Sequence, residues 1–144
     1  MPNPDYQPYV HAGNGRMYSS QEAHNLSRAV EMYERVLMRW DASLVEEYIA
    51  PGYVQHSALA ADGVQPLKDF LTMAAREWPE ARFRIARVIV DGDFVAMHLW
   101  GALRPDEPGS AIVDIFRMAD GMIVEHWDVI QQIPAKLAHA NGMV

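Results

Sequence analysis

The sequence predicts a single α+β domain in which helices come first and an antiparallel sheet follows. Apolar residues recur at steps of three and four up to about residue 78, as on one face of a helix. From residue 81 onward they follow strand-like patterns in four segments, joined in pairs by the short turns "DGD" and "ADG". With 144 residues the chain has the length of one domain. We expect the helices to cover one face of a curved sheet.

The first helix is expected to begin after Ser19, because Ser19 and Glu22 have the S-x-x-E spacing of a capping box. Its apolar face is predicted to consist of Ala23, Leu26, Val30, Tyr33, Leu37 and Trp40.

Two further helices are expected before the sheet. A short one follows Asp41 and is ended by Pro51-Gly52. The piece "YVQHSA" is strand-like, and "AADG" is a turn. The next helix runs from about Val64 to Trp78, where Pro79 ends it. Its inward residues are expected to be Leu67, Phe70, Leu71, Ala74 and Ala75.

Four strands follow in two hairpins, "RFRIARVIV" with "FVAMHLWGAL" and "AIVDIFRM" with "MIVEHWDVIQ". The longer segment "RPDEPGS" joins the hairpins. We expect residues 1–18 to form an extended arm, 19–135 the domain and 136–144 a polar tail.

Composition narrows the possible partners and the compartment. A net charge of −7 argues against nucleic acid or an anionic membrane surface. No segment has the pattern of a signal peptide or the length of a membrane span. The absence of cysteine excludes disulfides, thiolate catalysis and cysteine-based zinc sites. A soluble cytoplasmic protein is therefore expected.

The last strand carries ionisable residues on a face that should be apolar. His126 and Asp128 are two residues apart and so share a face of this strand. A three-residue loop, Ala119-Asp120-Gly121, would pair Asp114 with His126 and Ile112 with Asp128, which brings the three ionisable side chains together. A two-residue loop would instead oppose Asp114 to Trp127 and separate them.

Two carboxylates beside one imidazole suit proton transfer. A carboxylate bonded to histidine fixes its tautomer and raises its basicity, and an apolar cavity raises the pKa of an acid toward neutrality. Such a cluster is also found on solvated sheet faces and in structural ion pairs. It could instead surround a metal ion, with His98 as a further ligand.

Other polar residues are candidates for contact with a substrate. His56 follows Gln55 at the end of the strand-like piece, and His98 shares its face with Trp100. No G-x-S-x-G elbow and no glycine-rich phosphate loop preceded by a strand is present.

Three segments, "YIAPGYVQHSALAADG", "RVIVDGDFVAMHLW" and "AIVDIFRMADGMIVEHWDVIQQIP", resemble the SnoaL-like polyketide cyclases of the nuclear transport factor 2-like superfamily, in particular the branch predicted to catalyse aldol condensation. The likeness covers about residues 20–135. It implies a cone-shaped, cystatin-like α+β barrel with a pocket at its wide end, and dimers. It also implies cofactor-free chemistry in which a strand aspartate, at the position of Asp128, takes a proton next to a carbonyl. The characterised cyclases pair that acid with a histidine on the neighbouring strand, where this chain carries Asp114.

The lead hypothesis is thus a small enzyme, without cofactor or metal, that acts on an apolar carbonyl compound and forms a homodimer. Asp128 would be the base, tuned and oriented by His126 and Asp114, and His56 and His98 would bind the carbonyl oxygen. The remaining residues expected to contact the substrate are Gln55, Tyr53, Trp100, Phe116, Met97 and Met118. The alternatives are an isomerase or dehydratase of the same superfamily, a binding or dimerisation module without chemistry, and a metal-assisted hydrolase.

Overall fold

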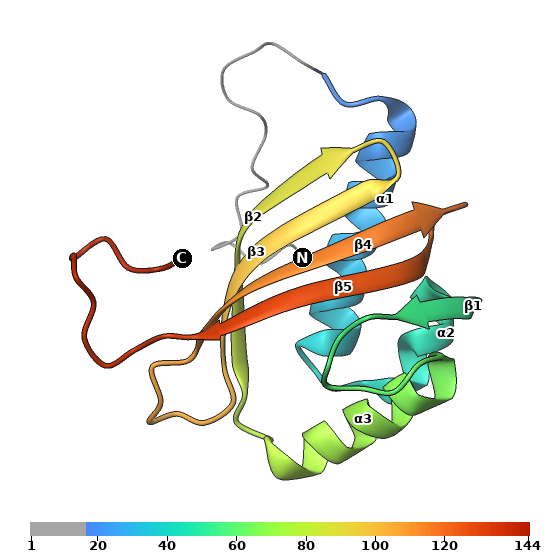
Figure 1. The fold of residues 1–144 in the computed structure, drawn as a ribbon. Coiled ribbons are helices and arrows are strands. Elements are labelled where there is room, and N and C mark those ends of the chain that lie inside the picture. Colours follow the sequence, from blue (N-terminus) through green and yellow to red (C-terminus); the bar gives the residue numbers. More distant parts are fainter. Residues whose placement is uncertain (1–16) are drawn as a thin grey trace.

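The computed structural model of the protein describes residues 17–144 (Figure 1). Almost all of the expected arm at residues 1–18 therefore lies outside the described residues. Among those described, three α-helices cover a five-stranded sheet, whose first strand lies in the chain between the second and the third of them. The α-helices are α1 (Ser20–Met32), α2 (Val45–Tyr48) and α3 (Val64–Glu77). The strands are β1 (Ile49–Gln55), β2 (Arg82–Asp91), β3 (Phe94–Ala102), β4 (Ser110–Ala119) and β5 (Met122–Gln132).

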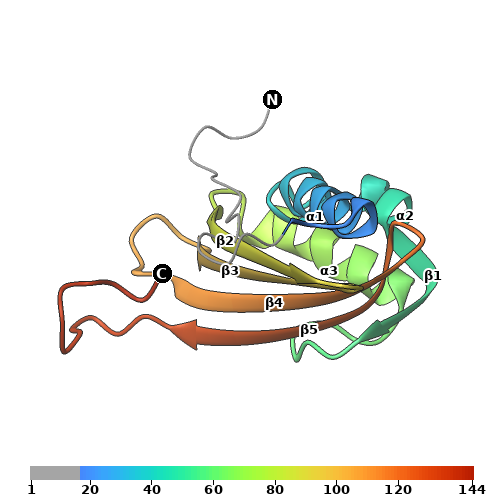
Figure 2. The same ribbon diagram turned by 90° about the horizontal axis from the view of Figure 1, so that it is seen from above.

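The sheet has the order β1-β5-β4-β3-β2, and its last four strands form the expected antiparallel meander. β1 is the exception because it pairs with β5 in parallel, which makes the sheet mixed. All three helices lie on one side of the sheet (Figure 2). The sheet curls around them without closing, so the predicted α+β architecture is confirmed.

The region around Pro51 differs from the prediction. The short helix α2 ends at Tyr48, before the proline, and Pro51 and Gly52 lie within β1. Between Ile49 and Val54 the pairing of β1 with β5 is interrupted. Because β1 is an edge strand, a proline without a donor N–H is tolerated there. The interruption brings Gln55 opposite His126.

Helix α1 begins with the predicted capping box. The Glu22 N–H donates to the Ser19 hydroxyl, and the Ser19 N–H donates to the Glu22 carboxylate. The buried face is turned from the expected one, because Ala23 is exposed whereas Glu22 and Asn25 are buried. Both bind the β2–β3 turn: Glu22 accepts from the N–H of Gly92, and the Asn25 amide donates to its carbonyl. Their polar groups are therefore satisfied despite burial.

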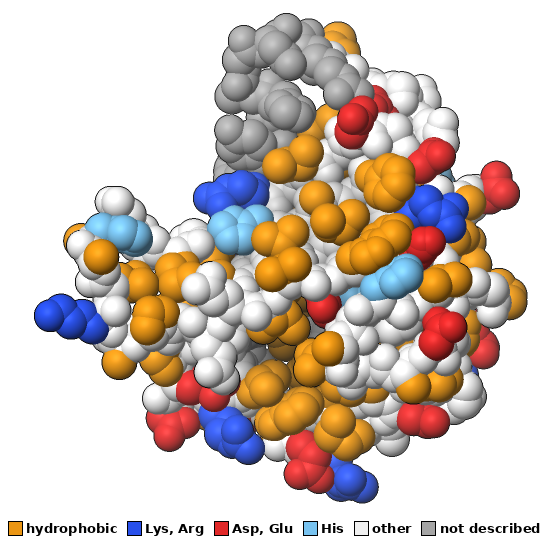
Figure 3. Space-filling model, in the orientation of Figure 1, with side chains coloured by type: hydrophobic (Ala, Val, Ile, Leu, Met, Phe, Trp, Pro, Cys, Tyr) orange, Lys and Arg blue, Asp and Glu red, His pale blue; other side chains and the backbone are white. Residues whose placement is uncertain are grey.

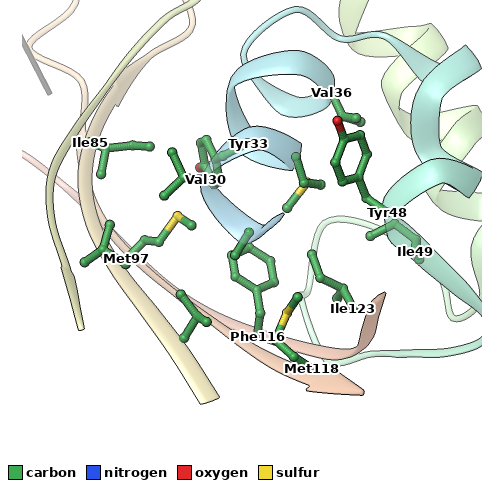
Figure 4. Packing of buried hydrophobic residues seen from close by; sticks show 14 of the residues in the cluster. Val30, Tyr33, Val36, Tyr48, Ile49, Ile85, Met97, Phe116, Met118 and Ile123 are labelled. Atoms are coloured by element: carbon green, nitrogen blue, oxygen red, sulfur yellow. The ribbon is translucent and has the colours of Figure 1, made fainter. Parts of the chain in front are cut away.

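After Met32 the helix continues as a π-helical turn, Tyr33–Leu37. Such turns contain one residue more than an α-helical turn and occur often at functional sites. Tyr33 and Val36 are buried here, and Leu37 packs against the same core. The turn points the Tyr33 side chain toward the sheet (Figure 4).

The core lies between the helices and the concave face of the sheet (Figure 4). Side chains from α1, α2 and the strands interdigitate, and the buried hydrophobic residues include Val30, Tyr48, Ile85, Met97, Phe116, Met118 and Ile123. In α3, Leu67, Leu71 and Ala74 are buried as expected, whereas Ala75 is exposed.

The β4–β5 hairpin does not have the predicted register. Its loop has two residues, Asp120 and Gly121, both with positive φ, and Ala119 pairs with Met122. After the next pair, Met118 with Ile123, β5 contains one extra residue, Val124, which forms a β-bulge. Beyond the bulge Phe116 pairs with His126 and Asp114 with Asp128. The bulge thus returns His126 and Asp128 to the concave face, which the two-residue loop alone would not have done.

Replacing Ser19 by alanine is expected to lower the free energy of unfolding by about 1 kcal/mol, because an N-cap hydroxyl that binds a backbone N–H is lost. Urea unfolding monitored by circular dichroism measures this. Ser27→Ala, at an exposed interior position of the same helix, is the control and should change stability by no more than about 0.5 kcal/mol. Equal effects of the two substitutions would contradict the capping role.

Candidate active site

A cavity of about 680 Å³ lies between the helices and the concave face of the sheet. Pockets that hold small molecules commonly have this size. On the face shown in Figure 3 a hollow lined with hydrophobic side chains opens into the molecule. Most of the lining is apolar, contributed by the π-helical turn, α3, β1, the β3–β4 loop and the strands β4 and β5. Its polar lining includes Tyr33, Tyr53, Gln55, Asp114, His126 and Asp128.

The three ionisable residues predicted from the sequence do meet in this cavity. Asp114, His126 and Asp128 each offer a ligand or proton-transfer atom, and these atoms all lie within 4.8 Å of one another. Asp114 and His126 are buried, and Asp128 is half-buried. Their partners differ from the prediction, since Asp128 faces Asp114 across the ladder and His126 faces Phe116.

Asp114 is fully engaged by protein donors. The Tyr33 hydroxyl donates to Oδ2 at 2.9 Å, and His126 Nε2 donates to Oδ1 at 2.7 Å. Two carboxylates directly opposite each other on a sheet repel. The two donors offset this repulsion by stabilising the negative charge of Asp114.

The second nitrogen of His126 is also engaged. Nδ1 lies 2.8 Å from Gln55 Oε1, which accepts the Ser57 N–H at 3.0 Å. Because the Ser57 N–H can only donate, the atom of the Gln55 amide that faces both Ser57 and His126 must be the oxygen. Both nitrogens of His126 therefore face oxygens of the protein.

Asp128 is different from its neighbours. Among residues 17–144 its carboxylate makes no hydrogen bond or ion pair, and it lines the cavity. It is thus the carboxylate of the cluster that remains free to receive a proton from a bound molecule.

Two phenols border the carboxylates and remain neutral. Burial, then the negative charge of Asp114, raises the pKa of Tyr33 well above its ordinary value. Burial likewise raises the pKa of Tyr53, again with a contribution from Asp114. Tyr53 lines the cavity, so its hydroxyl can donate to an oxygen of a bound molecule.

The far part of the cavity is aromatic. Trp40 packs against Phe70, Trp78 and Phe83 with ring centroids 5.4–6.3 Å apart, and all four line the cavity. The Trp40 indole donates to the Trp78 carbonyl at 3.1 Å. Trp40 has a φ of 52°, which is unfavourable for a bulky residue. Surrounding contacts therefore hold this ring in place.

Several residues expected to contact a substrate lie elsewhere. His98 and Trp100 are on the outer face of β3, away from the cavity, so the prediction that they line it is wrong. His98 contacts Arg87 there, and partial desolvation together with the Arg87 charge lowers its pKa. Met97 lies on the concave face but is fully buried in the core, as is Met118.

His56 also lies outside the cavity lining. Its ring stacks on Trp127 with centroids 4.9 Å apart, and its Nε2 is 3.7 Å from Glu125. Both histidines that were predicted to bind the carbonyl oxygen, His56 and His98, therefore lie outside the cavity lining. Tyr53, Gln55 and Phe116, by contrast, line the cavity.

Tyr33 and Trp40 were not predicted as site residues from the sequence. Both were assigned to the apolar face of the first helix, where a phenol and an indole are ordinary core residues. Their polar groups were the available signal, because a buried Tyr hydroxyl or Trp N–H requires a partner. Neither partner, Asp114 or the Trp78 carbonyl, is close in sequence.

The cluster of Asp114, His126 and Asp128 has donor types that suit a divalent metal. An ion bound through Nε2 of His126 would have to replace its hydrogen bond to Asp114, because that nitrogen needs its lone pair to coordinate.

Comparison with known proteins agrees with this fold. A family model described as "SnoaL-like domain" matches residues 17–126, most of the chain. The protein belongs to the SnoaL-like family. Its fold is that of the nuclear transport factor 2-like superfamily. No curated protein sequence matches the chain significantly. None of the helices in the described part is long and apolar enough to cross a membrane.

Solved structures of similar fold cover most of this SnoaL-like chain. A "putative SnoaL-like polyketide cyclase" from Jannaschia sp. CCS1 is 21% identical, with a TM-score of 0.69 over 81% of this chain and 91% of its own. A "putative polyketide cyclase" from Acidithiobacillus ferrooxidans is 18% identical, with a TM-score of 0.64 over 79% and 91%. AclR, "a putative hydroxylase" from Streptomyces galilaeus, is 21% identical, with a TM-score of 0.63 over 78% and 82%. At these identities the likeness establishes the fold.

The raised pKa values of Tyr33 and Tyr53 predict a loss of stability in alkali. Each phenol ionises at lower pH in the unfolded chain, so above about pH 10 the folded state holds more protons and loses up to about 1.4 kcal/mol per pH unit per tyrosine. Urea unfolding between pH 8 and 11.5 measures the slope. Tyr33→Phe should be less stable at pH 8, because Asp114 loses a donor, but should lose less stability above pH 10. A slope equal to that of the wild type would contradict this.

Proposed function

We propose that this SnoaL-like protein is a cofactor-independent cytoplasmic enzyme that removes a proton next to the carbonyl of an apolar small molecule. The observation that supports this most is the free carboxylate of Asp128 in a largely apolar cavity, beside a carboxylate whose oxygens are both occupied. A base in such a place is kept from bulk water and from competing protein donors.

In the proposed reaction Asp128 takes the proton from the carbon next to the carbonyl. The electron pair of that C–H bond forms an enolate whose charge lies on oxygen, and the neutral Tyr53 hydroxyl donates to that oxygen. In an aldol ring closure the enolate carbon attacks a second carbonyl of the same molecule and forms a C–C bond. The resulting alkoxide recovers the proton from the Asp128 carboxylic acid, so the enzyme returns to its initial state.

Asp114 and His126 act as positioning residues in this proposal. Their mutual hydrogen bond, with Tyr33 and Gln55 at its ends, joins the π-helical turn to β4, β5 and β1. This hydrogen-bonded chain holds in place the part of the cavity wall that lies beside Asp128. His126 is not the base, because neither ring nitrogen is left to accept a proton from a bound molecule.

Isomerase and dehydratase chemistry need the same proton transfer and remain alternatives. A binding module without chemistry is favoured by the engagement of Asp114 and His126 with each other, whereas the free Asp128 favours catalysis. A metal-assisted hydrolase rests on the donor types of the same three residues.

Asp128→Asn is expected to lower turnover by two orders of magnitude or more, because the amide keeps the shape and removes the base. The measurement is incorporation of solvent deuterium next to the carbonyl of a ketone that the wild type exchanges, followed by NMR. Asp69→Asn removes an equal charge at an exposed position of α3 outside the cavity lining and should have no effect. Unchanged exchange in Asp128→Asn would exclude Asp128 as the base.

We also propose that the protein forms a homodimer through the outer face of the sheet. Ile89, Phe94, Val113 and Val129 are exposed there, on strands whose other face contacts the core. Figure 3 shows hydrophobic side chains gathered over this face. An apolar surface of this kind on a soluble protein favours burial by a partner.

Val129→Glu is expected to convert the dimer to a monomer, because a charge would be buried without a partner. Sedimentation equilibrium measures the mass. Ala75→Glu, at an exposed site on α3, should leave the dimer intact. A monomeric wild type at micromolar concentration would contradict the proposal.

A further inference from the structure

The end of the cavity near the β3–β4 loop carries one unpaired positive charge. Arg104 is the only Lys or Arg among the cavity-lining residues of the described chain. Its guanidinium is exposed and forms no hydrogen bond or ion pair with residues 17–144. Arginine binds carboxylate and sulfonate groups well, because its planar N–H groups match two oxygens at once.

The loop that carries Arg104 is held in place by several bonds. The carboxylate of Glu107 accepts the backbone N–H groups of Leu103 and Arg104. The Trp100 indole donates to the Pro108 carbonyl at 2.9 Å, and Arg82 donates to the Pro105 carbonyl at 3.3 Å. The position of the Arg104 backbone is therefore fixed, and only its side chain has to be ordered when it binds a ligand.

The downstream end of the loop is equally constrained. Gly109 has a φ of 86°, and a Cβ atom there would lie 2.5 Å from the Gly101 carbonyl oxygen. Its own carbonyl accepts the Ile133 N–H at 2.9 Å. The loop therefore packs against the end of β3 and is bonded to the residue that follows β5.

The other charges in the cavity leave two free groups of opposite sign. Asp114 and His126 bind each other, and Glu107 binds backbone N–H groups. What remains is the negative Asp128 on β5 and the positive Arg104 on the loop. A ligand that reaches both therefore needs a proton to give up at one end and a negative charge at the other.

Strand geometry separates Asp128 from the end of the sheet that borders the loop. Gln132 lines the cavity and pairs with Ser110, which pairs with Gly101 at the start of the loop segment. It follows Asp128 by four residues, which corresponds to about 13 Å along a strand. The lining between them includes Ile130 and Ile112, which are apolar.

We propose that the ligand of this cavity is a carbonyl compound with an anionic group, a carboxylate or an equivalent, bound by Arg104 at the loop end. An apolar body separates that group from the carbon that gives its proton to Asp128. The proposal rests on the proposed function for the role of Asp128. The charge at the loop end is tested separately.

Two fluorescent probes with one skeleton test it. Anilinonaphthalene sulfonate and N-phenyl-1-naphthylamine differ in a single sulfonate group, so the first reports on the anion site and the second on the apolar cavity. Fluorescence titration of the wild type and of variants gives a dissociation constant for each probe. Arg104→Ala is expected to weaken binding of the sulfonate about tenfold or more, and Arg104→Lys less, because the charge remains without the planar donor pair. Binding of the neutral probe should change less than twofold.

A control variant separates this effect from a general loss of positive charge. Arg76→Ala removes a positive charge from the exposed face of α3, where Arg76 contacts Glu77, and should leave both probes unchanged.

The outcomes are distinguishable. An unchanged sulfonate affinity in Arg104→Ala, or an equal loss for both probes, would overturn the anion site and leave the proposed function standing. If the wild type bound neither probe, the cavity would not accept apolar ligands, and both proposals would fail.

Discussion

The extra residue in β5 decides on which side of the sheet the ionisable groups lie. The β4–β5 hairpin closes with the tight turn Asp120-Gly121, and an uninterrupted ladder from that turn would place Asp114 opposite Trp127. Because side chains alternate, a shift of one residue moves every later side chain to the other face. The bulge at Val124 makes that shift, so His126 and Asp128 face the helices together with Asp114. The cavity chemistry proposed here depends on this one backbone irregularity.

Bringing two carboxylates face to face in a poorly hydrated space has an electrostatic cost. The structure offsets this cost at only one of them. Asp114 receives the Tyr33 hydroxyl and the His126 ring, whereas Asp128 has no protein donor among the described residues. The asymmetry separates a carboxylate that maintains the site from one that is available to a ligand. Arg104 is likewise available to a ligand, because it is the free charge of opposite sign at the loop end of the same cavity.

The sequence allowed the helices, the two hairpins and the shared face of the three ionisable residues to be predicted, because capping, proline and alternation are local signals. The register was predicted wrongly because a bulge leaves the alternation on either side unchanged and has no composition of its own. Met97 and His98 were both assigned to the pocket, although adjacent strand residues face opposite sides, and only the buried side of β3 could settle which one points inward. Tyr33 was missed because its partner, Asp114, is 81 residues away. Long-range pairings of this kind carry no local pattern.

The arrangement of His126 tests this account most directly. Proton NMR of protein with 15N-labelled histidine reports on the hydrogens of each ring nitrogen and on their exchange with water. If the cluster converges inside the cavity, the Nε2 proton of His126, which is bonded to Asp114, should be protected from exchange. A ring whose protons all exchange rapidly with water would mean that the last strand turns these groups toward solvent, and the proposed site would not exist.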